Sequence, residues 1–329
     1  MSFLAVLLAL AIEQLKPLPR DNSVHELLKR WVAWTGRNFD AGQPHHAWVV
    51  WVVSVLVPAL VVAALDIAIR EWSLLLALAF EVLLLYLTLG FRQFSHYFTD
   101  IRDALDRGDE EEARRLLAEW RHLDTSELPR TELLRHVIEH ALLAAHRHVF
   151  GVFFWFVALS AVGLGPMGAV LYRMAEFSAR YWGYRQRTMD APVNELLMTL
   201  ARRVFTAIDH VPARLTAFGF AVVGNFEDAI ASWRRDAGLW QHANEGIILA
   251  AAAGAVGIQL GGAAAPGVTP DRSKSFAAGS EPGSADASGS TAGVPAQTGH
   301  LHSVVGLVWR SVVLWMLLLA LLTLANVVG

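Results

Sequence analysis

Residues 48–91 read WVVWVVSVLVPALVVAALDIAIREWSLLLALAFEVLLLYLTLGF, two long apolar runs that meet at Arg70-Glu71. A membrane-spanning helix needs about 20 predominantly apolar residues, and each run reaches that length. The stretch therefore predicts a transmembrane hairpin with its tight turn at Arg70-Glu71. Pro58 lies inside the first helix and is expected to kink it, because proline lacks the amide hydrogen of the helical ladder.

Glu81 stands in the middle of the second run. A carboxylate at this depth is costly when it faces lipid. We therefore expect Glu81 to face protein and to pair with an arginine or histidine of a neighbouring helix.

The composition of the whole chain agrees with a membrane protein. Of its 329 residues, 54% are hydrophobic and only 17% are charged, whereas soluble domains average about 45–50% and 25%. The net charge of -3 and the lack of a basic, aromatic-rich patch give no sign of nucleic-acid binding. The chain has no cysteine, which excludes disulfides and thiolate metal sites.

Both ends of the chain are apolar as well. Residues 1–12 are short for a span, but no basic region precedes them and Glu13 replaces a small-residue cleavage site. We interpret them as an uncleaved first membrane helix within an N-terminal membrane region, residues 1–91. Residues 311–328 predict a final span inside a C-terminal membrane segment, residues 303–329.

Residues 92–148 form a polar insertion between apolar segments. Asp109 is placed to cap a helix with an acidic first turn, and a longer helix is expected to follow Pro129. Basic residues are frequent in this region, and the positive-inside rule assigns it to the cytoplasm. We therefore expect a cytoplasmic helical insertion.

Residues 149–265 are expected to form the membrane core. The apolar stretch 149–172 is broken by Gly163-Leu164-Gly165-Pro166, and basic residues flank it on both sides. A re-entrant helix–break–helix with both ends cytoplasmic satisfies the positive-inside rule, whereas a single crossing does not. Residues 246–265 are apolar mainly through alanine and glycine, which favours packing inside a bundle over contact with lipid.

A segment rich in Gly, Ser, Ala and Pro, residues 266–302, is expected to be a disordered linker. The sequence as a whole predicts an all-α, polytopic integral membrane protein with about four to six membrane helices, one of its segments being re-entrant.

The most unusual polar stretch is Ile208–Ala217, IDHVPARLTA, which stands between apolar segments. A charged pair and a proline near membrane depth are tolerated where they face protein, water or a ligand. Asp209 and Arg214 are therefore the best candidates for a functional site.

A second motif is His136-Val137-Ile138-Glu139-His140, the H-x-x-E-H pattern of one class of zinc proteases. The two histidines share one helix face. A polar helix face near the membrane surface explains the same residues, and it is the interpretation we favour.

At this point four blocks occur in the order found in one family, and the chain resembles the CobD/CbiB family of membrane proteins of cobalamin biosynthesis. Asp209–Thr216 is similar to the family's D-W-I-P-A-R-L-T and is the most specific match. The other three blocks are Asp124-Thr125 with Leu128 and then Glu139, Val152–Trp155, and Asn244–Gly246 followed by Ala253–Gly262.

This resemblance implies a bacterial inner-membrane enzyme that joins aminopropanol, or its phosphate, to cobyric acid by an amide bond. It implies ATP and Mg²⁺ as cofactors and a corrinoid as substrate. The implied catalytic residues are Asp124, Glu139 and Asp209. The implied substrate-binding residues are Thr125, Arg214, Thr216, Asn244 and Gly246.

The chain also departs from this family. Residues 145–151 read AHRHVFG, where the family carries a run with more polar groups, and Tyr172–Phe177 replaces an N-T-L-D-S-M block. Glu13 and the V-P-x-R-L block, followed by Gly224, Glu227 and Trp233, resemble the AmpE group. That resemblance implies a non-catalytic signalling protein of the β-lactam response that acts through a membrane partner. A transporter using the helix breaks as a substrate site is a third possibility.

Overall fold

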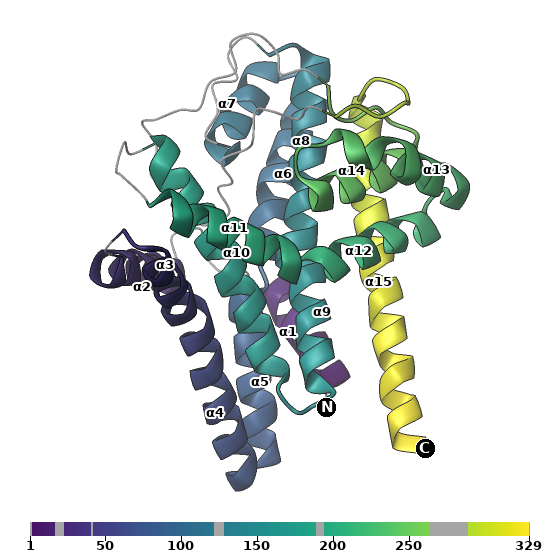
Figure 1. The fold of residues 1–329 in the computed structure, drawn as a ribbon. Coiled ribbons are helices and arrows are strands. Elements are labelled where there is room, and N and C mark those ends of the chain that lie inside the picture. Colours follow the sequence, from purple (N-terminus) through teal and green to yellow (C-terminus); the bar gives the residue numbers. More distant parts are fainter. Residues whose placement is uncertain are drawn as a thin grey trace.

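The computed structural model describes residues 2–16, 23–40, 42–121, 128–188, 194–262 and 289–328. Figure 1 shows an assembly of helices in which long apolar helices extend toward one end of the molecule. The polar helices gather at the other end, and several short helices lie across the boundary between the two. The described residues contain no strand beyond two isolated bridges, so the all-α expectation is confirmed.

The expected hairpin is formed by a continuous helical stretch, Pro44–Trp72, and by α5 (Leu74–Thr88). The first arm consists of α3 (Pro44–Trp51), the π-helix η1 (Val52–Leu56) and α4 (Val57–Trp72). The disturbance expected at Pro58 takes the form of this widened turn, since a proline removes one donor from the ladder. Ser54 donates its hydroxyl to the carbonyl of Val50 at 2.5 Å within the turn.

The hairpin carries a buried charge cluster. Arg70 of α4 donates to Asp66 Oδ2 at 2.8 Å and to Glu81 Oε1 at 2.5 Å. Both carboxylates are buried, whereas Arg70 is half-buried. The expected pairing of Glu81 with an arginine of a neighbouring helix is therefore confirmed.

Helix α1 (Ser2–Leu15) packs on α5. Ala5, Val6 and Ala9 are fully buried on one face, while the opposite face exposes leucines. Its 14 residues rise about 21 Å, which is less than the roughly 30 Å of a hydrocarbon core. The next helix, α2 (Ser23–Phe39), lies beside α3 at the polar boundary (Figure 1).

The polar insertion consists of α6 (Phe91–Asp106), α7 (Glu110–Arg121) and the start of a very long helix. Asp109 caps α7 as expected, because its Oδ1 accepts the amide hydrogen of Glu112 at 3.0 Å. The long helix comprises α8 (Arg130–Ala145), the π-helix η2 (His146–Phe150) and α9 (Gly151–Ser160). The polar insertion and the membrane core therefore share one rigid element of 31 residues.

Residues 161–164 reverse the chain, and α10 (Gly165–Thr188) returns along α9 (Figure 1). Gly163 adopts φ +78°, which favours glycine. A Cβ at Gly168 would lie 2.0 Å from the carbonyl oxygen of Trp155, so the two arms approach closely. The expected helix–break–helix is present, and both of its ends lie on the polar side.

Three short helices and one buried helix follow. Their bounds are α11 (Glu195–Ile208), α12 (His210–Val223), α13 (Phe226–Asp236) with the 3-10 turn η3 (Ala237–Leu239), and α14 (Ala243–Val256). The middle of α14 is buried on all sides, as its small residues suggest. A Cβ at Gly254 would lie 2.3 Å from the backbone of Asp228, so α13 and α14 need this glycine.

Residues 289–302, the last part of the expected linker, are ordered in the structure. Residues 263–288 lie outside the described residues, but Ser290 and Val294 form bridges with Gly261 and Ile258. Helix α15 (Thr298–Val328) then begins within the segment assigned to the linker. Small residues can still pair through their backbone, which composition alone does not reveal.

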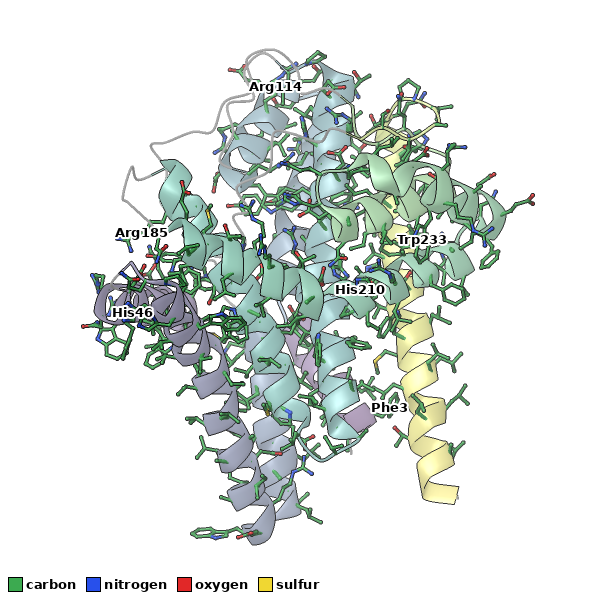
Figure 2. The ribbon with its side chains drawn as sticks, in the orientation of Figure 1. Phe3, His46, Arg114, Arg185, His210 and Trp233 are labelled. Atoms are coloured by element: carbon green, nitrogen blue, oxygen red, sulfur yellow. The ribbon has the colours of Figure 1, made fainter. Side chains whose placement is uncertain are left out.

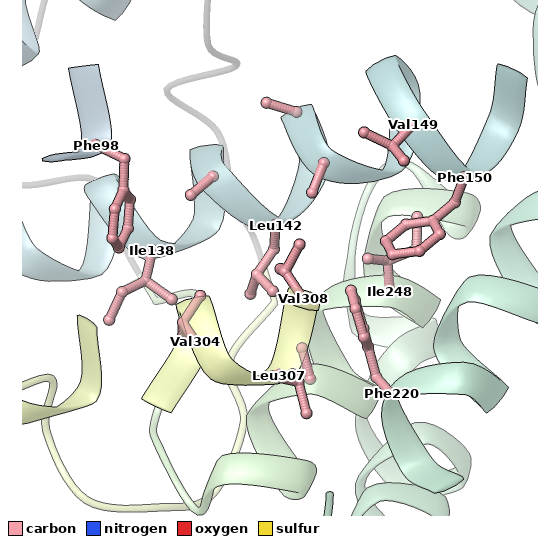
Figure 3. Close-up of a cluster of buried hydrophobic side chains, with 14 of the residues drawn as sticks. Phe98, Ile138, Leu142, Val149, Phe150, Phe220, Ile248, Val304, Leu307 and Val308 are labelled. Carbon is pink, nitrogen blue, oxygen red and sulfur yellow. The ribbon is translucent and has the colours of Figure 1, made fainter. Parts of the chain in front are cut away.

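The main hydrophobic core lies where α8, α12, α14 and α15 meet. Figure 3 shows Ile138, Leu142, Phe220, Ile248 and Val304 among the side chains that converge there. Three helical stretches in the described residues are long and apolar enough to cross a membrane, namely 44–72, 130–160 and 298–325. The fold is thus that of an all-α membrane protein.

Candidate functional site

Asp209 stands at the junction of α11 and α12, where its backbone ends one helix and starts the next. Pro212 explains why the two helices do not merge, since it has no amide hydrogen for the carbonyl of Ile208. That carbonyl instead accepts the indole N–H of Trp155 at 3.1 Å. The junction therefore turns Asp209 into the protein, where it is only 5% exposed.

Three side chains from three other elements donate to the Asp209 carboxylate. His146 Nε2 of η2 and the Tyr172 hydroxyl of α10 each lie 2.8 Å from Oδ1. Asn244 Nδ2 of α14 lies 3.1 Å from Oδ2. A buried carboxylate needs such donors, because burial removes the water that would otherwise solvate it.

His146 also contacts Thr216, so a continuous chain of hydrogen bonds crosses the site. Its Nδ1 lies 2.9 Å from Thr216 Oγ1. A neutral imidazole satisfies both contacts when Nε2–H donates to Asp209 and Nδ1 accepts from the Thr216 hydroxyl. Serine hydrolases use the same arrangement, in which a carboxylate binds an imidazole and the imidazole activates a hydroxyl group. We call Asp209, His146, Thr216, Tyr172 and Asn244 the Asp209 cluster.

Arg214 and Asn244 form the edge of this cluster. Arg214 is half-buried and donates to the carbonyl of His210 at 2.8 Å and to Asn244 Oδ1 at 3.5 Å. Asn244 Nδ2 is shared with the carbonyl of Thr206 at 3.0 Å. Gly246 instead packs against the backbone, because a Cβ there would lie 2.5 Å from the Ala237 carbonyl oxygen.

Glu139 belongs to a second polar cluster on the same long helix. It lies seven residues before His146, which places the two on one face about 10.5 Å apart along the axis. Its Oε1 accepts from Gly261 N at 2.7 Å and from Arg135 Nη1 at 3.3 Å. Gly261 has φ +76°, a conformation that favours glycine. The glycine-rich block therefore folds back onto Glu139.

The H-x-x-E-H motif is not arranged as a zinc site. His136 Nδ1 lies 2.7 Å from Arg121 Nη1, and a guanidinium would repel a metal cation at this position. Nowhere in the part of the chain that the structure describes do three His, Asp or Glu side chains converge as metal ligands.

Four residues predicted from the sequence therefore come together, namely Asp209, Arg214, Thr216 and Asn244. Glu139 lies in a neighbouring cluster, while Asp124 and Thr125 lie outside the described residues.

Sequence reasoning missed His146 and Tyr172. Both residues lie in segments that depart from the family pattern, His146 in residues 145–151 and Tyr172 in the block Tyr172–Phe177. The interval of seven residues between Glu139 and His146 was a usable signal, since it places both on one helix face.

The fold and the site together define a class of protein, an all-α membrane protein with a buried polar cluster where its membrane helices meet its polar helices. The family model described as "CobD/Cbib protein" matches residues 3–287. The chain belongs to the CobD/CbiB family.

Two relatives show how much of the chain the likeness covers. The cobalamin biosynthesis protein CobD of Stutzerimonas stutzeri is 33% identical over 267 residues, covering 80% of each chain. That of Chromobacterium violaceum is 35% identical over 213 residues, which is 63% of this chain and 64% of the relative. No solved structure gives a significant match.

Proposed function

We propose that this protein acts in cobalamin biosynthesis at the bacterial inner membrane. In this proposal it joins aminopropanol, or its phosphate, to the side-chain carboxylate of cobyric acid and forms an amide bond. Membership of the family and its similarity to cobalamin biosynthesis proteins support the pathway. The observation that carries the site is the hydrogen-bonded chain from Asp209 through His146 to Thr216.

Amide formation replaces one oxygen of the cobyric acid carboxylate with the amine nitrogen. That oxygen would leave as phosphate after activation of the carboxylate by ATP, the co-reactant that the family resemblance implies. The ammonium group of the amine must also lose two protons. In the proposed mechanism the amine gives a proton to the Thr216 hydroxyl as that hydroxyl gives its own to His146 Nδ1. Asp209 accepts from His146 Nε2 and stabilises the resulting imidazolium, which is the role of a carboxylate beside a catalytic histidine. Thr216 is buried, whereas Arg214 on the same helix is half-buried, and we propose that the amine enters beside Arg214.

Arg214 and Asn244 are proposed to hold the substrate. A guanidinium binds phosphate or carboxylate oxygens through paired hydrogen bonds, and an amide group can bind the carbonyl oxygen of the corrinoid side chain. Asn244 belongs to the Asp209 cluster and Arg214 contacts Asn244, so either group would be held next to the proton path.

The family resemblance implies ATP and Mg²⁺ as cofactors, and both remain part of the proposal. The described residues contain no group of three histidine, aspartate or glutamate side chains arranged as metal ligands. Mg²⁺ is commonly held by one or two carboxylates together with substrate phosphates and water, so ATP would supply most of its ligands.

Complementation tests the proposal. A bacterium that lacks its own cobinamide-forming enzyme is given this gene and must make cobalamin from cobyric acid. We expect growth with the natural chain and with the control Asp228→Asn, which changes an exposed carboxylate of α13, and no growth with Asp209→Asn. Immunoblots of the membrane fraction show whether each variant is present.

Failure of the natural chain to support growth, with the protein present in the membrane, would reject the reaction. It would also favour the AmpE-like signalling role, for which the comparisons offer no support so far.

A further inference from the structure

Helix α12 exposes an entirely apolar face. After His210, its exposed side chains are Val211, Leu215, Phe218 and Val222, each 39–48% exposed. They are spaced four, three and four residues apart, so they form one stripe along the helix. A helix at a water-exposed surface normally carries polar residues on its outer face, whereas all four exposed residues of this stripe are apolar.

The stripe lies on the face of α12 that is turned away from the rest of the protein. The other face of α12, which includes Ala213, Ala217 and Phe220, is fully buried, and α12 packs against α14 and α15. Figure 1 shows α14 on the polar side of α12, toward the insertion. The exposed stripe is therefore directed away from the polar half of the molecule.

The crossing of α15 and α12 indicates how deep α12 lies relative to the membrane surface. A Cβ at Gly219 would lie 3.3 Å from Trp315 Nε1, so the two helices cross at this point. Before the crossing α15 exposes Arg310 and then Val313, and after it α15 exposes Leu317 and Leu318. A tryptophan between a charged and an apolar segment is typical of a membrane–water interface.

The long helix gives the same depth independently. Its polar half ends with Arg147 and His148, and its apolar half contains Trp155, whose indole N–H binds the carbonyl of Ile208 just before α12. Two exposed arginines, Arg202 and Arg203, stand on α11 beside this junction. Their charge complements the anionic headgroups of a bacterial membrane.

We propose that α12 is an interfacial helix that lies on the membrane leaflet next to the polar insertion, with its stripe in the acyl chains. The occupant of the stripe is the lipid bilayer. Amphipathic helices of this kind bury their apolar face about 5–10 Å into the boundary between headgroups and acyl chains. The Asp209 cluster, at the start of α12, then lies at headgroup depth. This inference does not depend on the proposed reaction.

The chain has no cysteine, which makes single labels simple to place. Full-length protein carrying Val211→Cys, Phe218→Cys or Val222→Cys is labelled with a nitroxide and placed in nanodiscs of phosphatidylethanolamine and phosphatidylglycerol. Collision of each label with molecular oxygen, which concentrates in lipid, is compared with collision with a water-soluble nickel chelate. Glu227→Cys and Asp228→Cys, exposed on α13, are the matched controls.

The expected result is a several-fold higher ratio of oxygen to nickel collisions for the α12 labels than for the α13 labels. Equal ratios would place the stripe in water and overturn the proposal. Low collision rates with both reagents would show that protein covers the stripe, and this would overturn the proposal as well. Gel filtration confirms that each labelled variant remains folded.

Discussion

Two of the buried polar clusters in the described residues, the one around Arg70 and the Asp209 cluster, differ in how they are assembled. Arg70, Asp66 and Glu81 come from the two arms of one hairpin, within 16 positions of one another in the sequence. The Asp209 cluster draws its side chains from α10, α12, α14, η2 and the α11–α12 junction. In the first cluster, Arg70 offsets the charge of two nearby carboxylates. In the second cluster, the hydrogen bonds follow one order, from Thr216 through His146 to Asp209. Buried polar side chains therefore stabilise the fold around Arg70, whereas in the Asp209 cluster they form the chain of hydrogen bonds on which the proposed reaction rests.

The largest expected effect lies in the hairpin. Arg70→Met leaves two buried carboxylates without their common cation, and removing one partner of a buried pair costs about 3–5 kcal/mol. Arg70 is itself one-third exposed, so we expect the lower end of that range. Thermal unfolding in detergent measures the loss. The triple variant Arg70→Met, Asp66→Asn, Glu81→Gln should recover most of it, and no recovery would contradict a charge-balance role.

A change at Thr216 should affect activity more than folding, in contrast to the change at Arg70. Thr216→Val keeps the shape of the side chain but removes the hydroxyl that faces His146, and we expect product formation to fall about 10²–10⁴-fold. Mass spectrometry of cobinamide formed by isolated membranes measures the effect. Thr216→Ser should restore activity. If valine were as active as threonine, the proton path would be wrong.

A smaller effect is expected at Trp155, which supports the site without belonging to it. Trp155→Phe removes the donor to the Ile208 carbonyl, and an unsatisfied buried acceptor costs about 1–3 kcal/mol. The melting temperature should fall. Trp72→Phe, at the end of α4 where the side chain is 89% exposed, is the matched control and should leave it unchanged.

The smallest effect concerns pH. Burial, followed by the nearby arginines Arg180 and Arg173, lowers the pKa of His25 from 6.5 to about 3. Between these pH values the unfolded chain binds a proton that the folded chain excludes, so His25 favours folding above pH 6.5 and this contribution is lost as the pH falls. Chemical unfolding measured from pH 7 to pH 5 should show a shallower pH dependence for His25→Phe. An unchanged slope would contradict the assignment.

The membrane hairpin, the capped insertion and the break at residues 161–164 could all be predicted because each depends on a local pattern. The pairing of Glu81 was predictable for the same reason. The Asp209 cluster was predictable only in part, since Tyr172 and His146 reach Asp209 through packing between distant elements. Backbone pairing of residues 289–297 with the glycine-rich block left no signal in composition.

The π-helix at His146 has a consequence for how the sequence can vary. A π-turn accommodates an extra residue in a helix, so one residue could be lost here without breaking α8 or α9. Such a loss would convert the widened turn into an ordinary α-helical turn, and the faces of α8 and α9 would keep their relative orientation. The side chains of the turn are constrained more strongly, because His146 contacts Asp209 and Thr216 while Val149 and Phe150 are fully buried. The turn can therefore accept a change of one residue in length more readily than a substitution of His146.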